Sequence, residues 1–244
     1  MTAEQTINRT GYRPEGTVYG TLLNFRREQA LWAGRAAAPP YNAPPAAPAL
    51  YVKTANTFSE SGAAIALAPD VEAVWVGVSL GLVMNNFESF WHQPSVKSSV
   101  SATETEASGR LPEGTGLVLL ADLSVPHDSY YRPPVRFNCQ DGFLGIGAQC
   151  LPLASIGDIA ALKLELHING ALCQSVEMAD LVRGPAELLA DVLDFMTLQP
   201  GDVLMLGTDC LADGSRPLAR VGDRFEIRAP GFAPLVHTLV REAA

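Results

Sequence analysis

Positive charge is scarce in this chain of 244 residues. Lysine and arginine number 17 against 26 aspartates and glutamates, so the formal net charge is -9 and the isoelectric point is about 4.9. Proteins that bind nucleic acid neutralise phosphates with clustered lysine and arginine side chains. No basic cluster occurs in this sequence, so the composition argues against a nucleic-acid partner.

Cysteines and long apolar runs are also few. The cysteines are Cys139, Cys150, Cys173 and Cys210, with no Cys-x-x-Cys pair and no histidine at ligand spacing, which argues against a zinc site. Scattered cysteines without a signal-peptide pattern predict reduced thiols in a cytoplasmic protein. A membrane helix needs roughly 20 apolar residues. The longest candidate, residues 71–84, is interrupted by glycines and a serine, so no membrane span is expected.

Apolar residues are plentiful enough for a sizeable core. Hydrophobic residues make up 48% of the chain and charged residues 18%, as in ordinary globular proteins. We expect a flexible polar tail over residues 1–16 and a single domain over residues 17–244. Residues 85–116 are rich in serine, threonine and glutamate. This composition predicts a mobile loop or a lid, and it also fits plain disorder.

Residues 195–209 contain the stretch around which we expect the fold to be organised. Pro200-Gly201-Asp202 predicts a turn, and the short apolar run 203–206 predicts a strand buried on both faces. Such a strand would deliver Gly207 and Thr208 to an exposed end, where a bare backbone and one hydroxyl can contact a small ligand. A purely structural strand and loop is the alternative interpretation, weighed equally.

Short strands dominate the remaining pattern. Asn169-Gly170 between two alternating runs is a strong hairpin signal. Helices are expected at 25–35 and at 186–196, where Pro185 falls in the first turn. Strands are expected near 17–24, 50–53, 74–84, 117–122, 162–168, 171–176, 225–228 and 236–240. The pattern predicts a β-dominated α+β fold.

Several short motifs occur along the chain in a fixed order. They are Leu23-Asn24-Phe25, Lys53-x-x-Asn56-Thr57, Tyr130-Tyr131-Arg132-Pro133, Asp141-Gly142, Asn169-Gly170, Thr197-Leu-x-Pro-Gly-Asp202, Gly207-Thr208 and Gly222-Asp223. This ordered set resembles the fumarylacetoacetate hydrolase family over residues 20–240. Within the family the resemblance is nearest to the N-terminal half, or separate subunit, of the two-part isomerase/decarboxylases of 4-hydroxyphenylacetate (homoprotocatechuate) degradation.

The resemblance implies a mixed β-roll core with a few flanking helices. It also implies isomerase, decarboxylase or hydrolase chemistry on an unsaturated dicarboxylic 2-oxo or 2-hydroxy acid in aromatic catabolism. Active members hold Mg²⁺ or Mn²⁺ through a Glu-x-Glu pair and a later Asp, and the dication stabilises an enolate. The expected assembly is a homodimer or a heteromer with a homologous subunit.

The metal-binding pattern is incomplete in this chain. Gly77 and Ser79 stand where the resemblance places the two glutamates, and Asp122 matches the third ligand. One carboxylate and one hydroxyl are too few oxygen ligands for Mg²⁺, so no cofactor is expected in this chain. Glu104-x-Glu106 lies in the polar stretch and is interpreted as part of a solvated loop. An alternative function is therefore a metal-free structural partner of an active homologue.

Other residues supply the candidate site. Asp122 and, more weakly, Glu28 are catalytic candidates; Glu28 replaces a family histidine, and an exposed helical position is its alternative. His127 follows Asp122 in a loop, where a solvent-facing histidine is the ordinary expectation. Lys53 can alternatively pair with Asp122, and Arg132 can pack on its neighbouring tyrosines. The candidate substrate-binding residues are Lys53, Tyr131, Arg132, Gly207 and Thr208.

Overall fold

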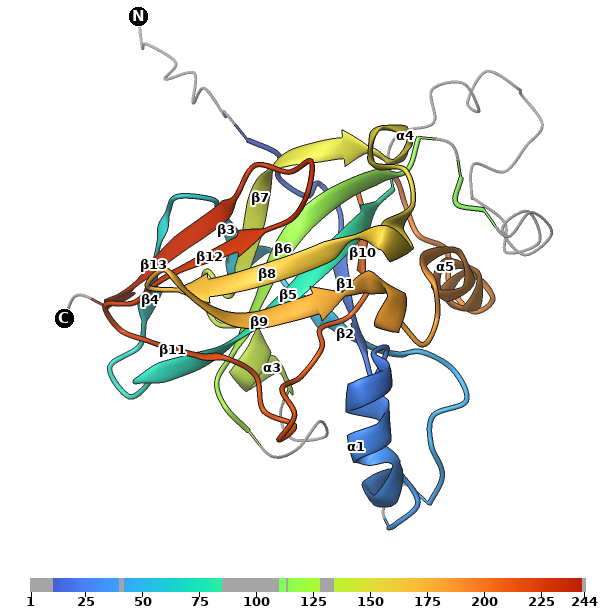
Figure 1. Cartoon of the computed structure of the whole chain (residues 1–244), viewed down its shortest axis with the longest axis horizontal. Coiled ribbons are helices and arrows are strands. Elements are labelled where there is room, and N and C mark those ends of the chain that lie inside the picture. Colours follow the sequence, from blue (N-terminus) through green and yellow to red (C-terminus); the bar gives the residue numbers. More distant parts are fainter. Residues whose placement is uncertain (1–10, 40–41, 85–109, 113, 128–133, 243–244) are drawn as a thin grey trace, which may run out of the picture.

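The structure, a computed structural model, describes residues 11–39, 42–84, 110–112, 114–127 and 134–242 (Figure 1). Two β-sheets form the body of the protein. The larger sheet has the order β2 (Ala49–Lys53), β1 (Val18–Leu22), β10 (Val203–Met205), β5 (Ala73–Val83), β6 (Gly116–Ser124), β7 (Leu144–Pro152) and β3 (Phe58–Glu60), with β11 (Leu218–Arg220) also paired to β5. The smaller sheet has the order β4 (Ala64–Leu67), β13 (Leu235–Arg241), β12 (Arg224–Arg228), β8 (Lys163–Ile168) and β9 (Ala171–Glu177).

Helices are short and lie at the margins of the two sheets (Figure 1). They are α1 (Arg26–Ala36), α3 (Pro134–Asn138), α4 (Leu153–Ile156) and α5 (Pro185–Leu193), with 3-10 turns at η1 (Ala55–Thr57), η2 (Ile159–Ala161) and η3 (Met178–Asp180). The predicted β-dominated α+β class is confirmed. Within the described ranges, no helix combines the length and apolarity needed to cross a bilayer.

The predicted strand after residue 202 is confirmed as β10, at the centre of the larger sheet. It pairs in parallel with β1 and antiparallel with β5, and all three of its residues are buried. Gly201 has a φ of +88°, which glycine adopts without steric cost. The Asp202 carboxylate accepts hydrogen bonds from Thr17 N at 2.7 Å and from Gln199 N at 2.7 Å. The turn is therefore fixed by its own aspartate.

The hydrophobic core lies between the two sheets. The long strand β5 contributes Val74, Val76 and Val78 to it, and each of these side chains is fully buried. Strands β5 and β6 pair over nine residues, from Trp75 opposite Ser124 to Val83 opposite Gly116. This regular register fixes which side chains of the two strands share a face, and it places Gly77 directly opposite Asp122.

Most of the predicted elements are present. The hairpin at Asn169-Gly170 joins β8 and β9, and both turn residues have positive φ, at 50° and 83°. Helix α5 begins at Pro185, as predicted. Strand β7 was not predicted, and α3 lies in a segment expected to be a loop. Of the predicted tail, residues 11–16 are described; Tyr12 N donates to Ala148 O at 2.9 Å.

Candidate functional site

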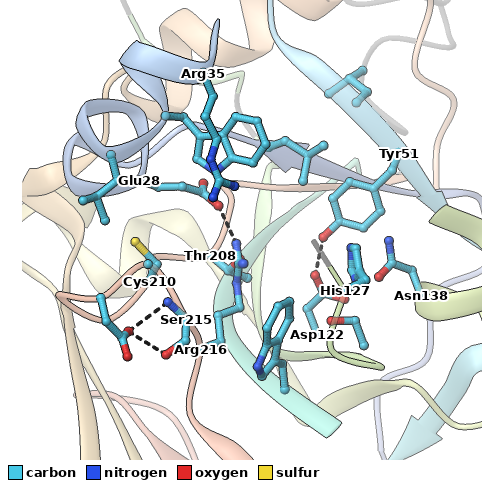
Figure 2. A pocket seen from close by; sticks show the side chains of 18 residues that line it. Glu28, Arg35, Tyr51, Asp122, His127, Asn138, Thr208, Cys210, Ser215 and Arg216 are labelled. Atoms are coloured by element: carbon cyan, nitrogen blue, oxygen red, sulfur yellow. Dashed lines mark hydrogen bonds and ion pairs between the residues drawn. The ribbon is translucent and has the colours of Figure 1, made fainter. Parts of the chain in front are cut away.

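A polar cavity of about 400 Å³ opens between α1, β2, β6 and the loop that follows β10. Two groups of interacting side chains line it (Figure 2). The first contains Glu28, Arg216 and Thr208, and the second is centred on Asp122 and Tyr51. Both groups combine opposite charges with hydroxyls, a set of side chains suited to binding and proton transfer on a small acid.

The Leu23-Asn24-Phe25 motif positions helix α1 over the cavity. The Asn24 side chain donates to Leu206 O at 2.8 Å and accepts from Arg183 N at 2.9 Å, which ties the start of α1 to the end of β10 and to the segment before α5. Leu23 has a φ of 58°, an uncommon conformation for a non-glycine residue. In this conformation its N–H donates to Glu28 Oε2 at 3.0 Å.

Glu28 is buried in the cavity wall, with 2% of its surface exposed. The alternative expectation of an exposed helical glutamate is therefore wrong. Its Oε1 lies 2.6 Å from Arg216 Nη2. Arg216 Nε in turn donates to Thr208 Oγ1 at 3.0 Å. A charge-assisted pair of this kind in a poorly solvated wall is held more firmly than a surface ion pair.

The second group is centred on Asp122. Lys53 Nζ lies 2.6 Å from Asp122 Oδ1, and the Tyr51 hydroxyl donates a short hydrogen bond to Asp122 Oδ2. Burial, followed by the negative charge of Asp122, raises the pKa of Tyr51 well above its usual value. Tyr51 is therefore a protonated hydrogen-bond donor across the physiological range.

His127 also lines the cavity and is half-buried there. Its ring stacks on Phe137, with centroids 4.9 Å apart and planes at 10°, and contacts Trp75 at 5.6 Å. Nδ1 lies 2.7 Å from Val125 O. Because a carbonyl can only accept, Nδ1 carries the proton of this hydrogen bond, which fixes the orientation of the ring.

Two of the predicted substrate-binding residues are not among the side chains that line this cavity. Lys53 has no exposed side-chain surface and lies behind Asp122, so the alternative pairing with Asp122 is the arrangement observed. Gly207 is not among the residues that line this cavity; its φ is +107° and its carbonyl accepts from Ser79 Oγ at 2.8 Å. Thr208 does line the cavity. Tyr131 and Arg132 lie outside the described residues.

Sequence reasoning missed Tyr51 and Arg216. Tyr51 and Lys53 are two residues apart on β2, and side chains at that spacing share a face of a strand. That alternation was a signal for Tyr51. Arg216 sits in an irregular loop, 188 residues from Glu28, and nothing local marks it. Long-range pairing of this kind is visible only in the folded chain.

The residues at the expected metal position do not fit a dication. Ser79 is buried and its hydroxyl donates to Gly207 O. A Cβ at Gly77 would lie 2.7 Å from Thr208 Cγ2, so that space is already filled. Asp122 is neutralised by Lys53. Among the described residues, no group of three or more His, Cys, Asp or Glu side chains is arranged to hold a metal ion.

The chain is thus a strand-dominated protein of two curled sheets with a small cavity that is lined by paired charges and hydroxyls. Comparison with known proteins makes the assignment specific. Residues 17–240 match the family model described as Fumarylacetoacetate (FAA) hydrolase C-terminal, and the chain belongs to the fumarylacetoacetate hydrolase family.

One curated relative is the 4-hydroxyphenylacetate degradation bifunctional isomerase/decarboxylase of Salmonella dublin, 34% identical over 228 residues. The match covers 93% of this chain and 48% of the relative, so the chain spans about half the length of the curated relatives it matches.

The fold is shared with solved structures, among them an isomerase and a hydrolase. The 2-hydroxyhepta-2,4-diene-1,7-dioate isomerase from Mycobacterium marinum has a TM-score of 0.64 and 18% identity, over 93% of this chain and 75% of that one. The maleylpyruvate hydrolase from Sphingobium sp. SYK-6, in complex with manganese and pyruvate, has a TM-score of 0.65 and 20% identity, over 94% of this chain and 72% of that one.

Proposed function

We propose that this chain catalyses a proton shift on an unsaturated dicarboxylic 2-hydroxy or 2-oxo acid, as an isomerase or isomerase/decarboxylase subunit of cytoplasmic aromatic catabolism. The observation that carries this proposal is the cavity itself, in which the carboxylate of Glu28 and the Tyr51–Asp122 pair line one space together with Arg216. A base, a hydroxyl donor and a cation are the groups that an enolate intermediate requires.

The reaction can be written on 2-hydroxyhepta-2,4-diene-1,7-dioate, the compound in the name of one structural neighbour. The O2–H bond breaks and its proton passes to a base. The electron pair moves through the diene to C5, where a proton from water forms the C5–H bond, and the product is the 2-oxo-3-ene. Loss of carbon dioxide from a carboxylate on C5 of a 2-oxo-3-ene sends the electron pair of the broken C–C bond through the alkene to the 2-oxo oxygen and leaves the same kind of dienolate, so one site can support either reaction.

Glu28 is the candidate base in this proposal. Its carboxylate is fixed at one oxygen by Arg216 and at the other by Leu23 N, so its position is set before substrate enters. Tyr51, oriented by Asp122, is the candidate hydroxyl donor toward the developing charge. No step is assigned to a metal ion, because the residues around Asp122 do not fit one.

The test is conversion of 2-hydroxyhepta-2,4-diene-1,7-dioate by the purified protein in EDTA, followed by the loss of diene absorbance. In deuterium oxide the product should carry deuterium at C5. Glu28→Gln should lower kcat by roughly 100-fold or more, since a positioned base contributes that much. Glu187→Gln is the matched control, because Glu187 is an exposed glutamate in the first turn of α5. Wild-type turnover by Glu28→Gln would contradict the assigned role.

A second candidate is a metal-free structural partner that completes the site of a homologous subunit. The observation in its favour is the neutralisation of Asp122 by Lys53 where relatives would need a metal ligand. This function predicts no turnover by the chain alone and turnover after mixing with a homologue that carries the Glu-x-Glu pair. We propose a homodimer, or a heteromer with such a homologue, and light scattering at micromolar concentration measures which assembly forms.

A further inference from the structure

We propose that the Arg216 guanidinium takes the place of the metal ion in this chain and binds the carboxylate and 2-oxo oxygen of the substrate. The identity of that substrate rests on the proposed function, but binding through Arg216 can be tested without turnover. Three features of the described residues support the inference: where Arg216 is anchored, what fills the space at Gly77, and how the nearby charges are balanced.

The backbone anchors Arg216 beside the expected metal position. Val76 N donates to Pro217 O at 2.9 Å, and β11 then continues the pairing with β5 from Leu218 onward. The segment that carries Arg216 is therefore tied to the residue next to Gly77. Gly77 stands opposite Asp122 in the β5–β6 register. Arg216 and Asp122 both line the cavity that opens at this point.

The absence of a side chain at position 77 makes room for the support of Arg216. Thr208 fills the space, since its Cγ2 lies 2.7 Å from the point that a Cβ of residue 77 would occupy. The Thr208 hydroxyl accepts from Arg216 Nε at 3.0 Å and fixes the plane of the guanidinium. A glutamate at position 77 would displace Thr208, so a carboxylate metal ligand and this arginine arrangement exclude each other.

Two of the carboxylates at the cavity are each balanced by a cation. Asp122 is balanced by Lys53, and Glu28 lies 2.6 Å from the guanidinium of Arg216, whose side chain is 12% exposed. A guanidinium can grip a planar carboxylate through two parallel hydrogen bonds and stays charged at all relevant pH values. A cation at this point would stabilise the negative charge that develops on the 2-oxo oxygen, as the dication does in metal-dependent chemistry.

The experiment uses oxalate, a planar probe that mimics a 2-oxo acid enolate, titrated calorimetrically into the full chain in EDTA. Wild type should bind oxalate. Arg216→Lys should weaken binding by roughly tenfold or more, because an ammonium cannot make the paired hydrogen bonds. Arg216→Gln should abolish measurable binding. Arg228→Lys should bind like wild type, because Arg228 is an exposed residue of the smaller sheet that pairs with Glu226 and does not line the cavity.

A charge-matched variant separates ligand contact from simple repulsion. Arg216→Gln leaves Glu28 without its counter-charge, and the remaining negative charge would itself repel oxalate. The double variant Glu28→Gln/Arg216→Gln removes both charges, and circular dichroism verifies that it folds. If Arg216 contacts the ligand, the double variant still fails to bind. Wild-type affinity in the double variant would overturn the proposal.

Two further results would also overturn it: unchanged oxalate affinity in Arg216→Gln, or oxalate binding by wild type that requires added Mn²⁺. The outcomes distinguish this inference from the proposed function. If oxalate binding depends on Arg216 but wild type does not convert the dienedioate, the proposed reaction is wrong and the binding role stands. If Arg216→Gln turns over the dienedioate normally, the role of Arg216 is wrong and the reaction stands.

Discussion

Replacing Lys53 with methionine tests whether Asp122 belongs to a buried ion pair. The Lys53 side chain has no exposed surface, and that of Asp122 is 13% exposed. Besides Asp122 Oδ1 at 2.6 Å, the ammonium lies near three carbonyl oxygens: Leu123 O at 2.8 Å, Asn138 O at 2.6 Å and Phe143 O at 3.0 Å. Methionine keeps the apolar stem and removes every one of these contacts.

The expected cost follows from the burial of the pair. Removing one partner of a buried ion pair costs about 3–5 kcal/mol, because the remaining charge is left uncompensated. For a domain of this size, each kcal/mol lowers Tm by about 2–4 °C, so Lys53→Met should lower Tm by roughly 6–20 °C. Urea unfolding followed by tryptophan fluorescence measures the free energy directly.

A double-mutant cycle isolates the pair itself. Lys53→Met/Asp122→Asn removes both charges, and it should cost less than the sum of the two single variants by about 1–3 kcal/mol. Lys163→Met is the control, because Lys163 lies 3.5 Å from Glu177 in an exposed pair that should contribute under about 1 kcal/mol. Additive costs, or a loss below about 1 kcal/mol in Lys53→Met, would refute the reasoning from burial.

Three other predictions concern neighbouring parts of the fold. The double variant Gly77→Glu/Ser79→Glu should lose about 1–3 kcal/mol of stability, because the new side chain at position 77 overpacks against Thr208. Electron paramagnetic resonance should show no Mn²⁺ binding by this variant until Thr208→Gly is added. Tight Mn²⁺ binding by the double variant alone would contradict this prediction. Burial lowers the pKa of His237 below 6.5, so below about pH 6.5 the unfolded chain takes up a proton that the folded chain does not. The stability of the wild type should therefore fall by up to about 1.4 kcal/mol per pH unit as the pH is lowered. In urea titrations, His237→Gln should lose less stability than wild type between about pH 7 and 5, and equal losses would disprove the assignment. Burial raises the pKa of Cys210 to about 11. The rate at which iodoacetamide alkylates Cys210, measured by mass spectrometry, should therefore keep rising with pH beyond about pH 9. A rate that levels off below that pH would contradict a buried thiol.

Local patterns were sufficient for the elements that position the site. The turn before β10 carries proline, glycine and aspartate in the order that a tight turn requires, and the hairpin at Asn169-Gly170 needs two positive φ values that these residues adopt easily. Strand β7 was missed because its glycines and its Gln149 break the apolar alternation. Residues 144–147, the first half of β7, are nevertheless buried, and the strand lies between β6 and β3 in the sheet.

The chemistry of the site was less predictable because it depends on long-range pairs. Asp122 and Glu28 could be proposed from their places in the motif order, but their partners could not. Glu28 is neutralised by an arginine 188 positions later in an irregular loop, and Lys53 is buried behind Asp122, where its ammonium also contacts three carbonyls. Burial and pairing of this kind are properties of the folded chain and leave little trace in local sequence.

The central claim is that this family member binds a 2-oxo acid through the guanidinium of Arg216 in place of a dication. The measurement that tests it most directly is a crystal structure grown with oxalate and MnCl₂, with anomalous diffraction recorded at the manganese edge. We expect oxalate density against Arg216 and no anomalous peak beside Asp122. A manganese peak coordinated by Asp122, with oxalate bound to the metal and Arg216 turned away, would contradict the account.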